Sequence, residues 1–170
     1  EFRGFSGTIV SGKIHKGDLI SVLPNGNNSK ISEIIVGGKK VTSASDKTAV
    51  TVTLDKEIDI SRGDMLVKYD EPCEISNQFQ VNLVWMTETP GLIGRSLLIK
   101  IGHQSAGVQI TNIKHKLNIN SFEKLPASTL QLNDICLVEI SLDKSIIFDE
   151  YSNSRSLGSF IIIDRITNQT

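Results

Sequence analysis

The chain has 170 residues, of which 39% are hydrophobic, so it is long enough for one ordinary domain or two small ones with a buried core. Its 18 basic and 19 acidic residues give a net charge of −1, which argues against broad electrostatic attraction to nucleic acid or to anionic lipid. No stretch approaches the roughly 20 continuous apolar residues that a membrane-spanning helix needs. We therefore expect neither a nucleic acid nor a membrane as partner.

The first predicted elements are two short strands within residues 2–23, where apolar and polar residues alternate on both sides of a turn. Three glycines interrupt the first run: Gly4, Gly7 and Gly12. Glycines within a strand mark bulges, sharp bends or close backbone approach, as at the corners of a small closed barrel. This segment is therefore expected to bend around a barrel.

Further strands are predicted where apolar and β-branched residues alternate with polar ones. They cover residues 50–54, 79–85 and 138–142, and the continuous apolar run 160–163 also has the length of a strand. Turn sequences separate the strands at residues 24–26 (PNG), 37–38 (GG), 62–64 (RGD) and 133–134 (ND). Asn25 and Gly26 fit a tight hairpin turn, because both tolerate a positive φ, and His103 is expected in another hairpin turn. Helical periodicity is almost absent, so the chain is predicted to be all-β.

A domain boundary is predicted at residues 69–75, a polar segment with Pro72, because proline cannot donate to a sheet ladder. Several short strands at regular spacing are typical of barrels. We therefore expect two consecutive small β-barrels, residues 1–70 and 75–170. The chain begins within a strand, so part of the first strand of the first barrel is expected to lie upstream.

No catalytic, cofactor-binding or metal site is predicted. Cys73 and Cys136 are 63 positions apart and, like the three histidines, lack the spacing of metal ligands, so we expect reduced cysteines in a cytoplasmic protein. The phosphate-loop pattern G-x-x-x-x-G-K-[S/T] has no match, so the chain itself is expected to bind no GTP and no Mg²⁺.

Three further features have candidate roles. The densest basic group is formed by Lys114, His115 and Lys116, and it is either an interface or a solvated strand end. Trp85 continues an apolar face, which favours a core position over an interface anchor. Asp164 and Arg165 close the last predicted strand and are candidates to pair at its end.

Several longer runs occur in a characteristic order. They are residues 59–66 (DISRGDML), 78–86 (QFQVNLVWM), 94–96 (GRS), 113–120 (IKHKLNIN), 125–127 (LPA) and 158–168 (GSFIIIDRITN). Residues 2–23 resemble the second, β-barrel domain of translation-factor GTPases. Together, and over essentially the whole chain, these runs resemble one family, the large GTPase subunit of sulfate adenylyltransferase (ATP sulfurylase).

This resemblance implies domains II and III of a translation-factor-like GTPase, present here as a C-terminal fragment. In the parent protein a preceding GTPase domain would bind GTP and Mg²⁺. GTP hydrolysis would be coupled to synthesis of adenosine 5′-phosphosulfate and pyrophosphate from ATP and sulfate on a small catalytic subunit. The fragment itself is then expected to be an inactive scaffold and coupling module. Its partners would be its own GTPase domain and the small subunit, with Lys114, His115 and Lys116 as candidate contacts.

Two other interpretations stay open. One is domains II and III of a translation elongation factor, which bind aminoacyl-tRNA across the two barrels. The other is an isolated β-barrel adaptor with no GTPase partner. Binding of RNA requires a basic face or exposed stacking aromatics, whereas this chain has a balanced charge and 5% aromatic residues. Composition therefore favours the sulfate-activating GTPase over the elongation factor.

Overall fold

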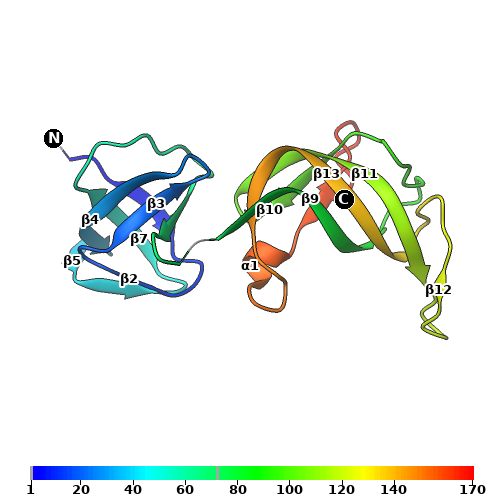
Figure 1. Cartoon of the computed structure of the whole chain (residues 1–170), viewed down its shortest axis with the longest axis horizontal. Coiled ribbons are helices and arrows are strands. Elements are labelled where there is room, and N and C mark those ends of the chain that lie inside the picture. Colours follow the sequence, from blue (N-terminus) through cyan, green and yellow to red (C-terminus); the bar gives the residue numbers. More distant parts are fainter. Residues whose placement is uncertain (1, 72) are drawn as a thin grey trace. The chain divides into compact units, whose positions relative to one another are not determined.

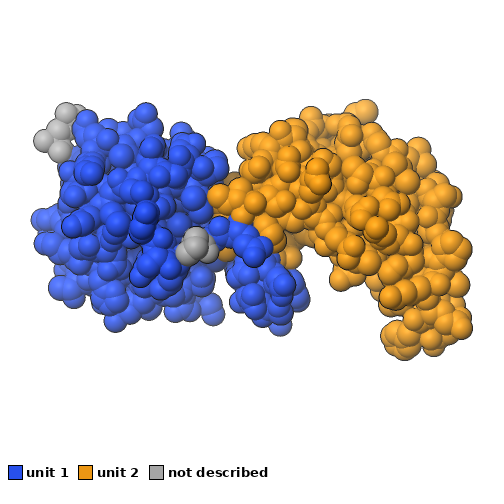
Figure 2. Space-filling model, in the orientation of Figure 1, with its two compact units in different colours: residues 1–74, 149–156 blue, residues 75–148, 157–170 orange. Residues whose placement is uncertain are grey.

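The computed structural model describes residues 2–71 and 73–170, and the chain divides into two compact units (Figures 1 and 2). Unit 1 comprises residues 1–74 and 149–156, and unit 2 comprises residues 75–148 and 157–170. Pro72, on which part of the boundary prediction rests, lies outside the described residues. Among the described residues the only helix is α1 (Arg155–Gly158), and no helix there is long and apolar enough to cross a membrane. The predicted all-β class is confirmed.

Unit 1 has eight strands among its described residues. They are β1 (Phe5–Thr8), β2 (Lys13–His15), β3 (Leu19–Leu23), β4 (Asn27–Val36), β5 (Lys39–Val41), β6 (Ser43–Ser45), β7 (Ala49–Leu54) and β8 (Met65–Lys68). The main sheet has the order β1-β7-β4-β3-β8 with β5 on β4, and β2 pairs with β6 separately. Side chains from several strands form one apolar core, which includes Ile20, Val22, Ile31, Ile34 and Val52.

The glycines of the first run have different structural roles. Gly4 is a site of close approach, because a Cβ there would lie 2.7 Å from Thr51 Cγ2. Gly12 has a φ of 80° and lies in the bend before β2. Gly7, in contrast, pairs regularly with Val50, and the irregularity in this sheet falls within β4 instead. The prediction of a bend or a close backbone contact is therefore met at Gly4 and Gly12 but not at Gly7.

The hairpin between β3 and β4 is longer than predicted. Its last strand pair is Val22 with Asn27, which leaves four connecting residues, and only Gly26 in this loop has a positive φ, of 75°. The two-residue turn expected at Asn25 and Gly26 is therefore wrong. The Gly26 amide donates to the Val22 carbonyl at 2.7 Å, which closes the wider loop.

Unit 2 is built around two long strands. Its strands are β9 (Glu74–Val84), β10 (Leu97–Ile101), β11 (Gln104–Leu117), β12 (Lys124–Leu125), β13 (Ile135–Phe148) and β14 (Ile161–Ile163). The sheet order is β14-β10-β11-β13-β9, and β12 extends β11 as a hairpin. The pair Ile101 and Gln104 closes the β10–β11 hairpin, which confirms the predicted turn at His103.

The core of unit 2 follows the predicted alternation. Val138, Ile140 and Leu142 of β13 are buried, and Phe79 and Phe148 meet edge to face with ring centroids 4.8 Å apart. Trp85 is 8% exposed and donates its indole N–H to the Thr89 carbonyl at 2.8 Å. The core position of Trp85 is therefore confirmed.

The sheets do not close into barrels among the described residues. The main ladder of unit 1 ends at β1 and β8, and that of unit 2 ends at β14 and β9. β1 and β8 have four residues each and β14 has three, so these edges offer few backbone groups for a closing ladder. Strand spacing predicted the type of the elements but not this open edge.

Candidate functional site

The basic stretch selected from the sequence lies near the end of β11, within unit 2. The β11–β13 ladder shifts register between Ile113 and His115, so Lys114 occupies an irregular position. His115 and Lys116 resume regular pairing with β13. A register shift of this kind re-aims neighbouring side chains and often lies beside functional surfaces.

Both lysines of this stretch are paired with carboxylates. Lys114 Nζ lies 2.7 Å from Glu139 Oε1, and Lys116 Nζ lies 3.5 Å from Asp134 Oδ1. The hydrogen bond from Lys114, followed by that from Asn112, lowers the pKa of the Glu139 carboxyl below its ordinary value. Each positive charge is thus offset by a neighbouring negative one. The stretch is therefore not the free basic face that binding of nucleic acid requires.

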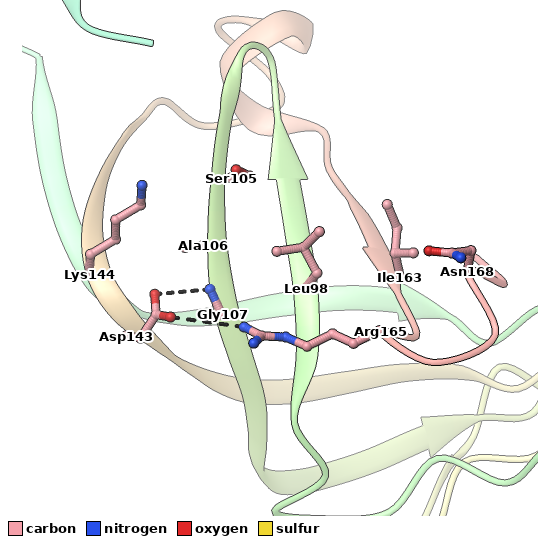
Figure 3. Close-up of a pocket in the computed structure, with 9 residues that line it drawn as sticks. All are labelled: Leu98, Ser105, Ala106, Gly107, Asp143, Lys144, Ile163, Arg165 and Asn168. Atoms are coloured by element: carbon pink, nitrogen blue, oxygen red, sulfur yellow. Dashed lines mark hydrogen bonds and ion pairs between the residues drawn. The ribbon is translucent and has the colours of Figure 1, made fainter. Parts of the chain in front are cut away.

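A surface hollow of about 630 Å³ lies toward the opposite end of β11, at residues 105–107 (Figure 3). Its lining residues are Leu98, Ser105, Ala106, Gly107, Asp143, Lys144, Ile163, Arg165 and Asn168. They come from β10, β11, β13, β14 and the segment after β14. No local motif links these segments, so sequence reasoning missed the hollow.

Gly107 lies at the centre of this hollow, beneath an ion pair. Asp143 Oδ1 accepts the Gly107 amide at 2.9 Å, and Asp143 Oδ2 lies 4.0 Å from Arg165 Nη2 (Figure 3). Arg165 Nε donates to the Leu97 carbonyl at 3.2 Å. A Cβ at residue 107 would overlap the side chains of Asp143 and Arg165. The absence of a side chain at Gly107 therefore allows these two charged groups to lie directly over its backbone.

The chemistry of the hollow suits surface contact better than catalysis. The side chains of Arg165 and Asp143 are 47% and 62% exposed, so water competes with any ligand for their charges. Ser105, Asp143 and Lys144 all line the hollow, but among the described residues no hydrogen bond joins Ser105 to either charged side chain. A nucleophile, a base and an orienting group are needed together for hydrolytic catalysis. In the part of the chain that the structure describes, no hydrogen bonds connect such a set of groups in the hollow.

Asp164 and Arg165 do not pair with each other. Arg165 reaches Asp143, whereas Asp164 pairs with Arg95, 69 positions earlier in the chain. The amides of Thr167 and Ile166 donate to Asp164 and lower the pKa of its carboxyl. The expected pair was wrong because both residues follow β14 in a turn, where the Asp164 carboxylate accepts amides of the turn and Arg165 extends toward Asp143.

The Gly-Lys sequences of unit 1 are turns and not phosphate-binding loops. Gly37 and Gly38 have φ values of 55° and 79° and connect β4 to β5, a pair of antiparallel strands. A phosphate loop instead leads from a strand into a helix. The sequence 62–64 (RGD) is likewise a turn before β8, where Asp64 Oδ2 accepts the Ser61 amide at 2.8 Å.

The cysteines are free thiols in protected surroundings. Burial and the neighbouring Asp134 raise the pKa of Cys136 to about 11, and burial raises that of Cys73. Thiolates are the form that attacks electrophiles and binds metals, so both residues are poorly suited to these roles. Within residues 2–71 and 73–170, no cluster of three His, Cys, Asp or Glu side chains is placed to hold a metal ion.

Solved structures of translation-factor GTPases have the same fold. Sup35 complexed with GDP aligns with a TM-score of 0.87 and 18% identity, over 97% of this chain and 41% of that chain. Elongation factor SelB from Methanococcus maripaludis, in complex with GPPNHP, aligns with a TM-score of 0.67 and 17% identity, over 86% of this chain and 33% of its own. Identity at this level shows the fold alone.

Curated relatives are more similar in sequence. The sulfate adenylyltransferase subunit 1 of Aliivibrio fischeri is 45% identical over 170 residues, and that of Saccharophagus degradans is 42% identical over 169. The bifunctional enzyme CysN/CysC of Xylella fastidiosa is 40% identical over 170 residues. These alignments cover 99–100% of this chain but 36%, 36% and 27% of the three relatives, so the chain spans about a third or less of their length.

The resemblance to the sulfate-activating GTPase subunit, drawn above from residues 59–168, is confirmed by these alignments. A family model described as GTP-eEF1A C-terminal domain-like matches residues 78–170, which contain all of unit 2 except residues 75–77, together with residues 149–156 of unit 1. Since that match covers more than half of the chain, the chain belongs to the GTP-eEF1A C-terminal domain-like family.

Proposed function

We propose that this chain is part of the GTP-hydrolysing subunit of a sulfate adenylyltransferase. The parent enzyme would form adenosine 5′-phosphosulfate and pyrophosphate from ATP and sulfate, and GTP hydrolysis would be coupled to that reaction. One observation carries the proposal: relatives named sulfate adenylyltransferase subunit 1 are 40–45% identical over 99–100% of the chain.

Within that enzyme the two β units would be non-catalytic binding modules. The Gly-Lys turns of unit 1 and the exposed ion pair in the hollow of unit 2 support this role, because neither can position a reacting phosphate. GTP and Mg²⁺ would be bound by a part of the subunit that this chain does not include. Coupling would then require a surface through which the β units transmit the nucleotide state to a second subunit.

The partners would be the GTP-binding region of the same subunit and the small catalytic subunit. The name "subunit 1" of the relatives supports a second subunit, and the free cysteines support a cytoplasmic location. Lys114, His115 and Lys116 would contribute to a contact through the exchange of ion pairs. Lys114 and Lys116 could leave Glu139 and Asp134 for carboxylates of the partner at little net cost, since exposed pairs contribute only about 0–1 kcal/mol.

An elongation factor that binds aminoacyl-tRNA is not proposed. Its support is limited to structural neighbours at 17–18% identity. The net charge of −1 and the paired lysines of β11 provide no strong attraction for a phosphate backbone.

Co-purification tests the proposed function. The longer polypeptide that contains this chain, with an affinity tag, is co-expressed with the small sulfate adenylyltransferase subunit of the same organism. We expect a stable complex whose adenosine phosphosulfate synthesis depends on GTP. The chain alone should hydrolyse neither GTP nor ATP. A complex that does not form, together with salt-resistant binding of aminoacyl-tRNA, would overturn the assignment.

A charge-removal experiment tests the basic stretch. The double substitution Lys114→Ala and Lys116→Ala should slow association with the small subunit and weaken its salt dependence, because charges at the rim of an interface act mainly on association. The matched control is Lys39→Ala with Lys40→Ala, on β5 of unit 1, where Lys40 is likewise paired, with Glu33 at 2.6 Å. Equal association rates for both double variants would show that the β11 lysines belong to a solvated strand end and do not take part in the contact.

A further inference from the structure

The hairpin between β11 and β12 presents two large apolar side chains to solvent. Its tip, residues 118–123, carries Ile119 at 63% exposure and Phe122 at 75% exposure. In Figure 1 the β11–β12 hairpin projects beyond the rest of unit 2, and Figure 2 shows unit 2 extended in the same place. Single exposed apolar residues are common on protein surfaces, whereas apolar residues grouped on one projecting turn are candidates for a contact site.

The hairpin tip is held in one conformation by its own hydrogen bonds. Asn118 donates its amide to the Glu123 carbonyl at 2.9 Å and accepts the Phe122 amide at 2.7 Å. The Asn118 side-chain oxygen also accepts the amides of Asn120 and Ser121, at 2.9 and 3.3 Å. A turn that is already ordered loses little conformational entropy when it binds.

The backbone of Phe122 is in an unfavourable conformation. Its φ is 58°, in the left-handed region that glycine and asparagine adopt easily and that bulky residues rarely occupy. Neither core packing nor a side-chain hydrogen bond explains a phenylalanine there, because the ring is largely exposed. Strained residues of this kind persist only where the surrounding structure holds them, and they cluster at binding and active sites.

The charges around the hairpin tip indicate which partner it fits. The formal charges of Glu123 and the adjoining Lys124 sum to zero, and the nearby Lys116 is paired with Asp134. An anionic membrane or a nucleic acid attracts clusters of lysines and arginines, whereas residues 118–124 contain one lysine and one glutamate. A neutral turn with an aromatic side chain instead fits an apolar pocket on a protein, the setting in which single aromatic residues dominate binding energy.

We infer that the β11–β12 hairpin tip is a preformed anchor that inserts Phe122, supported by Ile119, into an apolar pocket of the small sulfate adenylyltransferase subunit. This inference rests on the proposed function, which supplies the second subunit. It places the main apolar contact at the tip and leaves the lysines of β11 as peripheral charges. The register shift at Lys114 lies on the same strand, a few residues before the tip.

Substitution of Phe122 separates binding from folding. Phe122→Asn removes the ring but suits a positive φ, so the melting temperature should stay the same or rise. The dissociation constant for the small subunit should increase about 30-fold or more, as for the loss of an aromatic hot spot. Ile119→Ser should weaken binding in the same direction. The matched control is Ile166→Ser, which removes an 88% exposed isoleucine elsewhere in unit 2.

The outcomes distinguish the inference from the proposed function. If the unsubstituted protein does not bind the small subunit, both fail. If it binds and Phe122→Asn binds equally well, the anchor is wrong and the proposed function stands. Co-sedimentation with vesicles of phosphatidylserine and phosphatidylcholine should show no binding. Vesicle binding that Phe122→Asn abolishes would assign the tip to a membrane and overturn the inference, as would a Phe122-dependent dimer in analytical ultracentrifugation.

Discussion

Gln104 is the side chain that extends the contact between β11 and β13 beyond the end of their ladder. The last paired residues of that ladder are Val108 and Leu142, yet the Gln104 carboxamide reaches Ile147, five positions further along β13. It donates to the Ile147 carbonyl and accepts the Ile147 amide, both at 2.9 Å. Ile147 is 1% exposed, so water cannot readily replace these bonds.

Gln104→Leu keeps the approximate size of the side chain and removes both hydrogen bonds. The net loss of two hydrogen bonds, with a buried donor left unpaired, should lower the free energy of unfolding by about 2–4 kcal/mol. With an m value of about 1.5 kcal/mol per molar urea, the unfolding midpoint of unit 2 should fall by about 1.3–2.7 M.

Fluorescence of Trp85, the single tryptophan of the chain, reports the unfolding of unit 2 in a urea titration. The matched control is Gln109→Leu, which makes the same change at an exposed position of the same strand. We expect the control to change the midpoint by less than about 0.3 M. Equal midpoints for Gln104→Leu and the original chain would refute a role of these two hydrogen bonds in stability.

Three further predictions follow from the packing and from the pKa shifts. Gly91→Ala would place a Cβ 3.0 Å from both Leu130 Cβ and Trp85 Cη2, so the free energy of unfolding should fall by about 1–3 kcal/mol, whereas Gly7→Ala, with no atom within 4 Å, should change it very little. Because Gly7 lies in unit 1, both variants are followed in urea by far-UV circular dichroism, which reports both units. Because the pKa of Asp164 is lowered in the folded protein, its ionised carboxylate stabilises the fold. This stabilisation is fully present above the ordinary carboxyl pKa of 3.8 and is lost as the pH falls through the lower pKa of the folded state. Asp164→Asn should therefore reduce the melting temperature at pH 7, and the difference from the original chain should shrink below pH 4; a constant difference would contradict this. Cys136, with a pKa of about 11 and 2% exposure, should react with a thiol reagent at pH 8 about 100-fold or more slowly than free cysteine, measured in a Cys73→Ser background.

The sequence by itself determined the features that depend on local pattern. Alternation of apolar and polar residues identified β7, the second half of β9 and the central part of β13, because residues two apart in a strand share one face. The core position of Trp85 followed from the same pattern, whereas the turn at His103 was indicated by its place between Gly102 and Gln104. Three-residue strands such as β2, β5 and β6 are too short to show a period, so they were not predicted individually.

Tertiary structure alone decided which distant residues meet. Arg95 and Asp164 are 69 positions apart, and Gly107 is covered by Asp143 and Arg165, so no local pattern connects them. The register of β11 against β13 places Glu139 and Asp134 beside Lys114 and Lys116, which turns an apparent basic patch into two ion pairs. Charge in a sequence is a property of single residues, whereas the field at a surface depends on which residues the register of a sheet brings together.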